Sequence, residues 1–388
     1  MISSEIAVID LFAGPGGLSL GFQKAGFRVI IAVESDQSAA DTYEKNFPHT
    51  KILRKKIEET SGSELDEIAR IKGFEETLII AGPPCQPYSL GNRQNNGNGH
   101  PAASAVSHFV RLVEEVKPVA FLFENVVTFQ RMKGWDQFIN RLQAIGYSIS
   151  SGQLEARNFG VPQVRKRLFV AGFADEINFD IASLNKQTSR CPVVREAISG
   201  LPSLPSRGGG FDEASHSGDN TSSYSAHLAN GAKRLFNHWS TKHTEEVVRT
   251  INCIKPGKSL KTMWNILPES VKGRFHNFDS LHSNIYRRLA WRGFSPTIVH
   301  VRRAMLLHPR QNRILSVREA ARLQSFPDDF RFFGGKHNQY QQVANAVPPL
   351  MAECIADSFE EAFSKLKVCA HGRCNQNLED PLGLYYQI

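Results

Sequence analysis

The stretch IAVIDLFAGPGG, residues 6–17, joins an apolar run to a turn that contains three glycines. The run 6–12 is apolar enough for a buried strand, and the amphipathic segment LSLGFQKAG at 18–26 is typical of a helix. Gly14, Gly16 and Gly17 allow the backbone between them to approach a ligand closely. The stretch therefore predicts a strand–turn–helix unit with a ligand site at its turn.

The same alternation continues through the first 175 residues. Apolar segments predict further strands at 27–34, 77–82, 119–126 and 167–173. Helices are predicted at 35–47, with Ser35 or Asp36 as N-cap, and at 108–117. Strands that alternate with helices indicate an α/β, Rossmann-like, doubly wound and mostly parallel sheet, whose ligands bind at the carboxyl ends of the strands.

The pattern changes after residue 178. A Gly/Ser/Pro-rich stretch at 199–225 is typical of a long loop, and a helical pattern returns at 348–367. We therefore expect an α/β domain at 1–178, a smaller loop-rich domain at 179–338, and a C-terminal segment at 339–388 that returns to the first domain. The tail 370–388 has little pattern and is expected at the surface.

The composition excludes several classes of protein. No apolar run reaches the length of a membrane span, and the N-terminus lacks the features of a signal peptide, so a cytoplasmic protein is expected. The six scattered cysteines then indicate thiols rather than a disulfide framework. Cys369 and Cys374 lack a second Cys/His pair at zinc-finger spacing, so no metal is expected.

The positive charge is concentrated in one part of the chain. Residues 195–313 hold 18 Lys and Arg against 8 Asp and Glu, a surplus of 10 within a chain whose net charge is +8. The remainder therefore carries a net charge of −2. This asymmetry favours a polyanion-binding module, with a solvated basic face as the alternative.

The first glycine turn does not follow the G-x-G-x-x-G spacing of dinucleotide-binding folds. Glu34 nevertheless lies twenty residues after Gly14, at the end of the second predicted strand, where an acid can bind both ribose hydroxyls. A nucleoside without a pyrophosphate fits this pattern better, and S-adenosylmethionine is such a ligand. The alternative is a glycine turn that only connects the first strand to the following helix and binds no ligand.

Three reactive residue types lie near other strand ends. Cys85 lies within AGPPCQPYSL at 81–90, Glu124 ends the apolar run FLFEN, and Arg165 belongs to QVRKR at 163–167. A thiol, a carboxyl and a guanidinium at one sheet edge can form an activated nucleophile with an acid and a charge clamp. Each residue alone also has an alternative without a catalytic role: Cys85 as a buried structural cysteine, Glu124 as a surface acid and Arg165 as a solvated arginine.

The order of these motifs strongly resembles the cytosine-5 DNA methyltransferases. The series comprises DLFAGPGG, VE at 33–34, GPPCQPYS, ENV, QVRKR, REAARLQSFP at 318–327 and QVANAVPP at 342–349. The resemblance spans nearly the whole chain except about 180–296, where the family has its variable target-recognition region. It implies a catalytic and cofactor-binding domain at 1–178 and a target-recognition domain at 179–338.

The resemblance also implies roles in the reaction. Cys85 would attack carbon 6 of cytosine as a thiolate, Glu124 would hold and protonate ring nitrogen 3, and Arg165 would contact the base oxygen. The target base would be flipped out of the duplex. The residues that would contact S-adenosylmethionine are Phe12, Gly14, Gly16, Gly17, Glu34, Pro84, Asn345 and Val347. Those expected on the DNA side are Gln86, Ser89, Asn125, Arg167 and Thr297, the last as support for the target-recognition loops.

Three positions depart from the family pattern. Lys56 stands where the family usually has an aspartate that accepts from the adenine amino group, and lysine cannot accept a hydrogen bond. Glu58, Glu59 or the backbone would then supply that contact. Ala344 replaces a usual glycine, and the glycine-rich stretch 92–104 lacks the acidic and arginine residues of the family's closing loop.

The sequence therefore predicts a monomeric bacterial enzyme that methylates carbon 5 of cytosine in double-stranded DNA, using S-adenosylmethionine and no metal. It would serve a restriction–modification or phage-defence system, and it would be associated with the nucleoid. An RNA cytosine-5 methyltransferase of the same fold and a DNA-binding homologue with weak catalysis are the alternatives. The long basic insertion favours duplex DNA over RNA, and the presence of Cys85, Glu124 and Arg165 favours catalysis.

Overall fold

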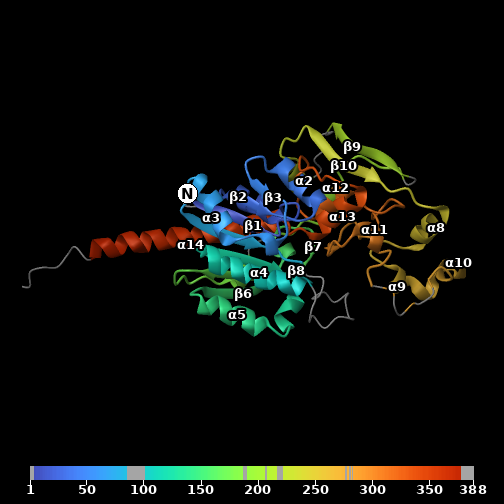
Figure 1. The fold of residues 1–388 in the computed structure, drawn as a ribbon. Coiled ribbons are helices and arrows are strands. Elements are labelled where there is room, and N and C mark those ends of the chain that lie inside the picture. The colour runs from blue at the N-terminus through green and yellow to red at the C-terminus, as the bar shows by residue number, and fades with distance from the viewer. Residues whose placement is uncertain are drawn as a thin grey trace, which may run out of the picture.

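A seven-stranded sheet forms the centre of the computed structural model (Figure 1), with the strand order β3-β2-β1-β4-β5-β8-β6. The model describes residues 4–84, 101–186, 190–205, 208–215, 222–275, 278, 281 and 283–376. The pairs from β3 through β5 are parallel, whereas β8 is antiparallel to β5 and to β6. The predicted α/β, mostly parallel sheet is confirmed.

The elements of this layered part follow the predicted alternation. The strands of the sheet are β1 (Ile6–Leu11), β2 (Arg28–Val33), β3 (Lys51–Leu53), β4 (Glu76–Ala81), β5 (Ala120–Asn125), β6 (Ser148–Glu155) and β8 (Lys166–Phe173). Its longer helices are α1 (Gly17–Lys24), α2 (Gln37–Asn46), α3 (Gly62–Ile71), α4 (Pro101–Val116), α5 (Trp135–Ala144) and α14 (Pro349–Gln376). Short 3-10 helices are η2 (Ile57–Glu59), η3 (Val127–Arg131), η4 (Ala156–Phe159) and η5 (Ile181–Lys186). Asp36 is the N-cap of α2, because its carboxylate accepts from the Ala39 amide at 2.8 Å.

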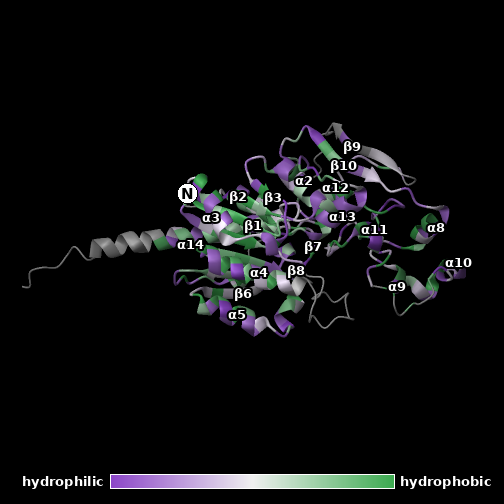
Figure 2. Cartoon of the chain, viewed as in Figure 1, coloured by the Kyte–Doolittle hydropathy of each residue, from purple (hydrophilic) through white to green (hydrophobic). Residues whose placement is uncertain are grey.

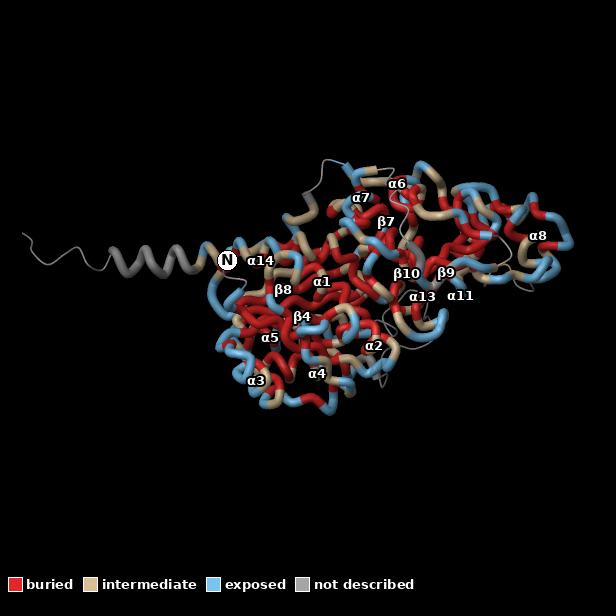
Figure 3. Tube along the Cα trace, turned by 90° about the horizontal axis from the view of Figure 1, so that it is seen from above, coloured by how far each residue is buried: buried red, intermediate tan, exposed pale blue. Residues whose placement is uncertain are grey.

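Alternate side chains of the strands enter different cores, as the pleat of a strand requires. On one face Val8, Ile80 and Leu122 pack with residues of α1 and α14. On the other face Ile9, Ile79, Phe121 and their neighbours pack with α3, α4 and α5. Figure 2 shows the hydrophobic residues concentrated along the strands, and Figure 3 shows the buried chain at the centre of this layered part. Both faces of the sheet are therefore covered.

The second part of the chain has short elements around a third core. They are α6 (Val194–Ile198), β9 (Gly209–Ser215), α7 (Ser223–Ala229), β10 (Arg234–Ser240), α8 (Glu245–Cys253), α9 (Leu260–Met263), η6 (Trp264–Ile266), α10 (Glu269–Lys272), α11 (Val301–Ala304), α12 (Val317–Leu323) and α13 (Lys336–Asn345). The β9–β10 pair is antiparallel. Fully buried ion pairs surround α12, with Arg313 Nη2 at 2.6 Å from Glu319 and Arg322 Nη2 at 2.5 Å from Asp328. These contacts give REAARLQSFP a structural role.

A buried glutamine joins the two parts. Gln163 belongs to β7 (Gln163–Val164), which pairs in parallel with β11 (Ser295–Pro296). Its side-chain nitrogen donates to the Leu323 carbonyl at 3.1 Å, and its side-chain oxygen accepts from the Ile298 amide at 2.9 Å. Thr297 Oγ1 donates to the Val164 carbonyl at 2.8 Å. The segment just before β8 is thereby fixed to the smaller part of the molecule.

Two local predictions were wrong. The stretch 199–225 is not one loop, because β9 lies within it and its backbone pairs with β10. The C-terminal helix continues past residue 367, because α14 includes the residues up to Gln376 and passes through Gly372. The domain boundaries at 178 and 338 stay predictions. No helix in the described ranges is both long and apolar enough to cross a membrane.

The crossing of α1 and α14 generates a stability prediction. A Cβ on Gly21 would lie 2.4 Å from the Cβ of Ala352 and 2.5 Å from the Glu353 amide nitrogen, so Gly21→Ala must push the helices apart. We expect it to lower the free energy of unfolding by about 1–3 kcal/mol, measured by denaturant titration. Gly273→Ala is the control, because its Cβ would meet only the Glu269 carbonyl oxygen, at 3.4 Å. Equal stability of the two variants would contradict this packing.

Candidate active site

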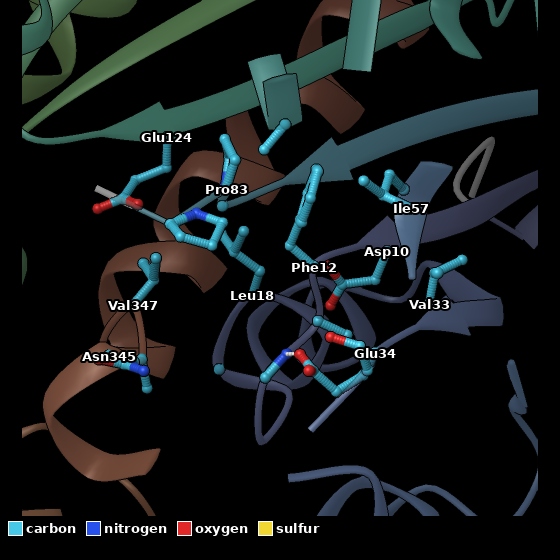
Figure 4. Close-up of a pocket in the computed structure, with 18 of the residues that line it drawn as sticks. Asp10, Phe12, Leu18, Val33, Glu34, Ile57, Pro83, Glu124, Asn345 and Val347 are labelled. Carbon is cyan, nitrogen blue, oxygen red and sulfur yellow. Dashed lines mark hydrogen bonds between the residues drawn. The ribbon is translucent and has the colours of Figure 1, made fainter. Parts of the chain in front are cut away.

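A cavity of about 620 Å3 opens at the carboxyl ends of β1, β2, β4 and β5 (Figure 4). The segments 55–58 and 344–347 complete its wall. Ten of the predicted site residues line it, namely Phe12, Gly14, Gly17, Glu34, Pro84, Glu124, Arg165, Asn345 and Val347 together with Arg167, which was predicted on the DNA side. The topology thus brings together residues that are up to 335 positions apart in the sequence.

The turn after β1 is held by Glu34, which directly follows the neighbouring strand β2. The Gly14 amide donates to Glu34 Oε2 at 2.8 Å, and the Asp36 amide donates to Glu34 Oε1 at 2.6 Å. Phe12 adopts a φ of 60°, which is unusual for a bulky residue, and it lies against the cavity. A Cβ on Gly17 would lie 2.3 Å from the Val347 carbonyl oxygen. Only glycine therefore allows the turn and the 344–347 segment to meet.

One end of the cavity is an apolar slot with a charged rim. Phe12, Val33 and Ile57 supply its apolar side chains, whereas Pro83 lies nearer to Glu124, as Figure 4 shows. Of the candidates to replace the usual aspartate, Glu58 lines the cavity together with Lys56. Glu59 is not among the lining residues, and its carboxylate accepts from the Lys56 amide at 3.4 Å. The sequence pattern did not identify Val33, Ile57 or Pro83 as wall residues.

Glu124 lies at the opposite side of the cavity from Glu34 (Figure 4). Its side chain is buried at the end of β5, and Arg167 Nε lies 3.0 Å from its Oε1. Burial raises the pKa of Glu124, while the positive charges of Arg167 and Arg165 partly oppose that rise. A carboxyl in this environment can hold a proton that an exposed glutamate would lose.

The two arginines of QVRKR have different surroundings. Arg165 is 1% exposed, and its Nη1 and Nη2 donate to the carbonyls of Ala344 and Ala346 at 3.3 and 2.9 Å. Arg167 instead places its Nε beside Glu124. Both arginines reach the cavity because β8 is antiparallel, so that its first residues lie at the carboxyl end of β5. The sequence predicted the cluster but not this difference.

The other predicted residues lie elsewhere. Gly16 packs on Phe47, whose ring would be 2.3 Å from a Gly16 Cβ, and it does not line the cavity. Asn125 is buried beside the cavity, and its side-chain oxygen accepts from the Val126 amide at 2.8 Å. Thr297 supports the β7–β11 junction. Cys85, Gln86, Ser89 and most of the stretch 92–104 lie outside the described residues.

Asp10 lines the cavity as well, although it was not among the predicted site residues. It follows four apolar residues of β1 and is 1% exposed. Its Oδ2 accepts from Ser19 Oγ at 2.6 Å. Burial raises the pKa of Asp10 to about 7, and the negative charge of Glu34 contributes to the rise. The sequence could have shown that Asp10 is an acid within a buried strand. It could not have shown that this side chain faces the cavity.

Comparison with known proteins identifies the family. Residues 6–361 match the family model of the C-5 cytosine-specific DNA methylases. The chain is 32% identical to the Type II methyltransferase M.DdeI of Desulfomicrobium norvegicum, over 93% of this chain and 90% of that protein. It is also 32% identical to the Type II methyltransferase M1.HphI of Haemophilus parahaemolyticus, over 91% of this chain and 86% of that protein.

Solved structures agree with this result. A structure described as a prophage-encoded DNA modification methyltransferase of E. coli superposes with a TM-score of 0.75 at 26% identity, covering 92% of this chain and 99% of that one. The Entamoeba histolytica methyltransferase EhMeth shares the fold, with a TM-score of 0.62 at 15% identity over 94% of this chain and 99% of that one. The chain therefore belongs to the C-5 cytosine-specific DNA methylase family.

Proposed function

We propose that this DNA cytosine-5 methyltransferase modifies one flipped-out cytosine within a specific duplex sequence, as part of a bacterial restriction–modification system. The observation that carries the proposal is the buried Glu124 beside Arg167, in the same cavity as Glu34. The names of the Type II relatives support the restriction–modification role. We further propose that the protein acts as a monomer in the bacterial cytoplasm, where its DNA is found.

The cavity residues fit S-adenosylmethionine. The apolar slot of Phe12, Val33 and Ile57 suits a flat purine, and the Glu34 carboxylate would accept from ribose hydroxyls. The 344–347 segment, including Asn345 and Val347, closes the other side. When bound, the cofactor supplies an electrophilic methyl group on a positively charged sulfur. The same cavity also reaches Glu124, so cofactor and base would lie close together.

The reaction would begin with a covalent bond from the Cys85 sulfur to carbon 6 of cytosine. Carbon 5 is a poor nucleophile until that bond forms, and Glu124 would donate a proton to ring nitrogen 3 so that negative charge does not build up on the ring. Carbon 5 then takes the methyl group. Loss of the carbon-5 proton then expels the Cys85 thiolate, and ring nitrogen 3 returns its proton to Glu124, which restores the aromatic ring.

Arg165 and Arg167 would have different roles in the reaction. We propose that Arg167 contacts the base oxygen, because its guanidinium lies beside the Glu124 carboxyl at the cavity. Arg165 would position the site, because its two nitrogens hold the carbonyls of the 344–346 segment. The predicted base contact of Arg165 is thus proposed for Arg167 instead.

DNA binding would use the basic part of the chain. The surplus of positive charge between residues 195 and 313 suits phosphate contacts, and the β7–β11 junction joins that part directly to the segment of Arg165. The target carbon is stacked inside a duplex, so the base must leave the stack before it can enter the cavity. Asn125, Thr297, Gln86 and Ser89 remain proposed contacts or supports on this side.

The first prediction concerns the covalent adduct. Duplex DNA that carries 5-fluorocytosine cannot lose its carbon-5 substituent as a proton, so the Cys85 bond should persist after methyl transfer. We expect a denaturation-resistant complex with the wild-type protein and none with Cys85→Ala, measured by gel mobility. Cys253→Ala, which removes a partly buried cysteine of the other part, should still be trapped.

Two results would contradict the assignment. Trapping by the Cys85→Ala variant would exclude this nucleophile. Trapping on RNA with none on any duplex DNA would exclude the DNA substrate.

The second prediction concerns pH. Glu124 acts in its acid form, so the single-turnover rate should fall as the pH rises through the pKa of Glu124. Arg167 lowers that pKa, so Arg167→Gln should reduce the rate and also move the alkaline fall to higher pH. Glu124→Gln should reduce the rate by about 10²–10⁴-fold while S-adenosylmethionine still binds.

Lys166→Gln is the matched control for this pH measurement. It removes the same charge one residue away, but its ammonium lies 3.6 Å from Glu155 and its side chain is 61% exposed. The pH profile of this variant should match the wild type. An alkaline fall that stays in place in Arg167→Gln would contradict the role given to Glu124.

A further inference from the structure

Two buried glutamines form a chain of hydrogen bonds between the smaller part of the molecule and the wall of the cavity. Gln163 of β7 and Gln324, the C-cap of α12, are both 0% exposed. The Ile298 amide donates to Gln163 Oε1 at 2.9 Å, and Gln163 Nε2 donates to Gln324 Oε1 at 2.9 Å. Gln324 Nε2 then donates to the Val343 carbonyl at 2.8 Å. We call this chain of hydrogen bonds the amide relay.

Backbone groups at both ends fix the direction of the amide relay. Gln163 accepts from a backbone amide with its oxygen, and its nitrogen also donates to the Leu323 carbonyl at 3.1 Å. The nitrogen of Gln324 faces the carbonyls of Val343 and Ala346, which can only accept. Turning either side-chain amide over would therefore oppose two donors or two acceptors. The relay is either complete or broken, and the broken state leaves buried polar groups without partners, which is costly.

The cavity wall needs such donors because prolines follow α13. In a helix the carbonyl of residue i accepts from the amide of residue i+4, and for the Ala344 carbonyl that residue is Pro348. Proline has no N–H, and Arg165 Nη1 donates to the Ala344 carbonyl instead, at 3.3 Å. Its Nη2 donates to the Ala346 carbonyl at 2.9 Å. The end of α13 thus depends on side chains from other elements.

The amide relay holds the same end of α13 as Arg165 does. Gln324 satisfies the Val343 carbonyl, one residue before the first carbonyl that Arg165 binds. Asn345 and Val347 follow directly and line the cavity, as Figure 4 shows. A shift of this helix end would therefore move the wall and the Arg165 guanidinium together.

We propose that Gln163 and Gln324 are positioning residues for methyl transfer, which hold the 344–347 wall and Arg165 in place against the smaller part of the molecule. Neither glutamine lines the cavity, so both act through the residues that do. This inference rests on the proposed function, because only there is the cavity assigned to the cofactor and the base.

The rate of methyl transfer to mixed-sequence duplex DNA, at saturating S-adenosylmethionine, tests the proposal. Gln324→Leu removes the middle donor and acceptor of the relay. We expect kcat to fall about ten- to hundredfold, because the wall and the reacting groups lose their alignment, while the KM for DNA stays within about threefold of the wild type.

Gln339→Leu is the matched control. It also removes a buried glutamine of α13, but Gln339 Nε2 donates to the Gly334 carbonyl at 3.0 Å, outside the relay. Its kcat should stay within about twofold of the wild type. Both variants are measured at a temperature at which circular dichroism shows them folded, so lost stability cannot explain a difference in rate.

A double variant tests whether the two glutamines act as one unit. Either single change breaks the whole relay, so Gln163→Leu should lower kcat about as much as Gln324→Leu. The two changes together should then be no slower than the slower single variant. Losses that multiply in the double variant would overturn the relay.

Gln324→Glu keeps the shape of the side chain, so it remains informative if Gln324→Leu does not fold. The introduced carboxyl accepts from Gln163 in either protonation state, but it donates to Val343 only when it is protonated. The kcat of this variant, divided by that of the wild type at the same pH, should therefore rise as the pH is lowered from 8.5 to 6. Lost packing alone would give a ratio that does not change with pH.

Two arginines lie near this position and set the direction of the pH effect. Arg165 shares the Ala346 carbonyl with Gln324, so its charge favours the ionised carboxyl, and the rise is expected toward acid pH. Arg322 of α12 is paired with Asp328 at 2.5 Å.

Two results would overturn the positioning role. One is a wild-type kcat in both Gln163→Leu and Gln324→Leu, and the other is a Gln324→Glu ratio that stays constant with pH. Failure of the wild-type protein to methylate duplex DNA would instead overturn the proposed function.

Discussion

The antiparallel pairing of β8 with β5 is the constraint on which the active site depends. In an all-parallel sheet the residues before β8 would lie at the opposite edge from the end of β5. The observed register pairs Asn125 with Leu168 and Glu124 with Phe169, so the chain enters β8 at the cavity. This reversal places Arg167 beside Glu124 and, through β7, connects the cavity to the smaller part of the molecule.

Three carboxyls at neighbouring strand ends have different surroundings, and those surroundings indicate different work. Glu34 accepts from two backbone amides and holds the turn after β1. Glu124 is buried beside an arginine, which suits an acid that acts on a base. Asp10 has a hydroxyl on one side and an open oxygen on the other. Environment rather than residue type thus distinguishes the three carboxyls, and the surroundings of Glu124 support the proton-donor role proposed for it.

The sequence predicts the parallel strands β1, β2, β4 and β5 because each is a short apolar run between turn residues, but it misses the three-residue parallel strand β3. It does not predict the edge strand β6, whose sequence SISSGQLE is polar and half exposed. The motif residues Glu34, Glu124 and Asn345 are found because they belong to recognisable patterns. The different contacts of Arg165 and Arg167 depend on which carbonyls meet them in space, and the open side of Asp10 depends on what is missing around it. Neither property is encoded in local spacing.

Nucleoside mass spectrometry tests the central claim most directly. Duplex DNA that contains many different sequences is incubated with the protein and S-adenosylmethionine carrying a deuterated methyl group, and the digested nucleosides are then analysed. The proposed chemistry predicts the label in 5-methyl-2′-deoxycytidine, and its absence when Glu124 is replaced by alanine. Label in N4-methylcytosine or N6-methyladenine, or label found only when RNA replaces the DNA, would contradict it.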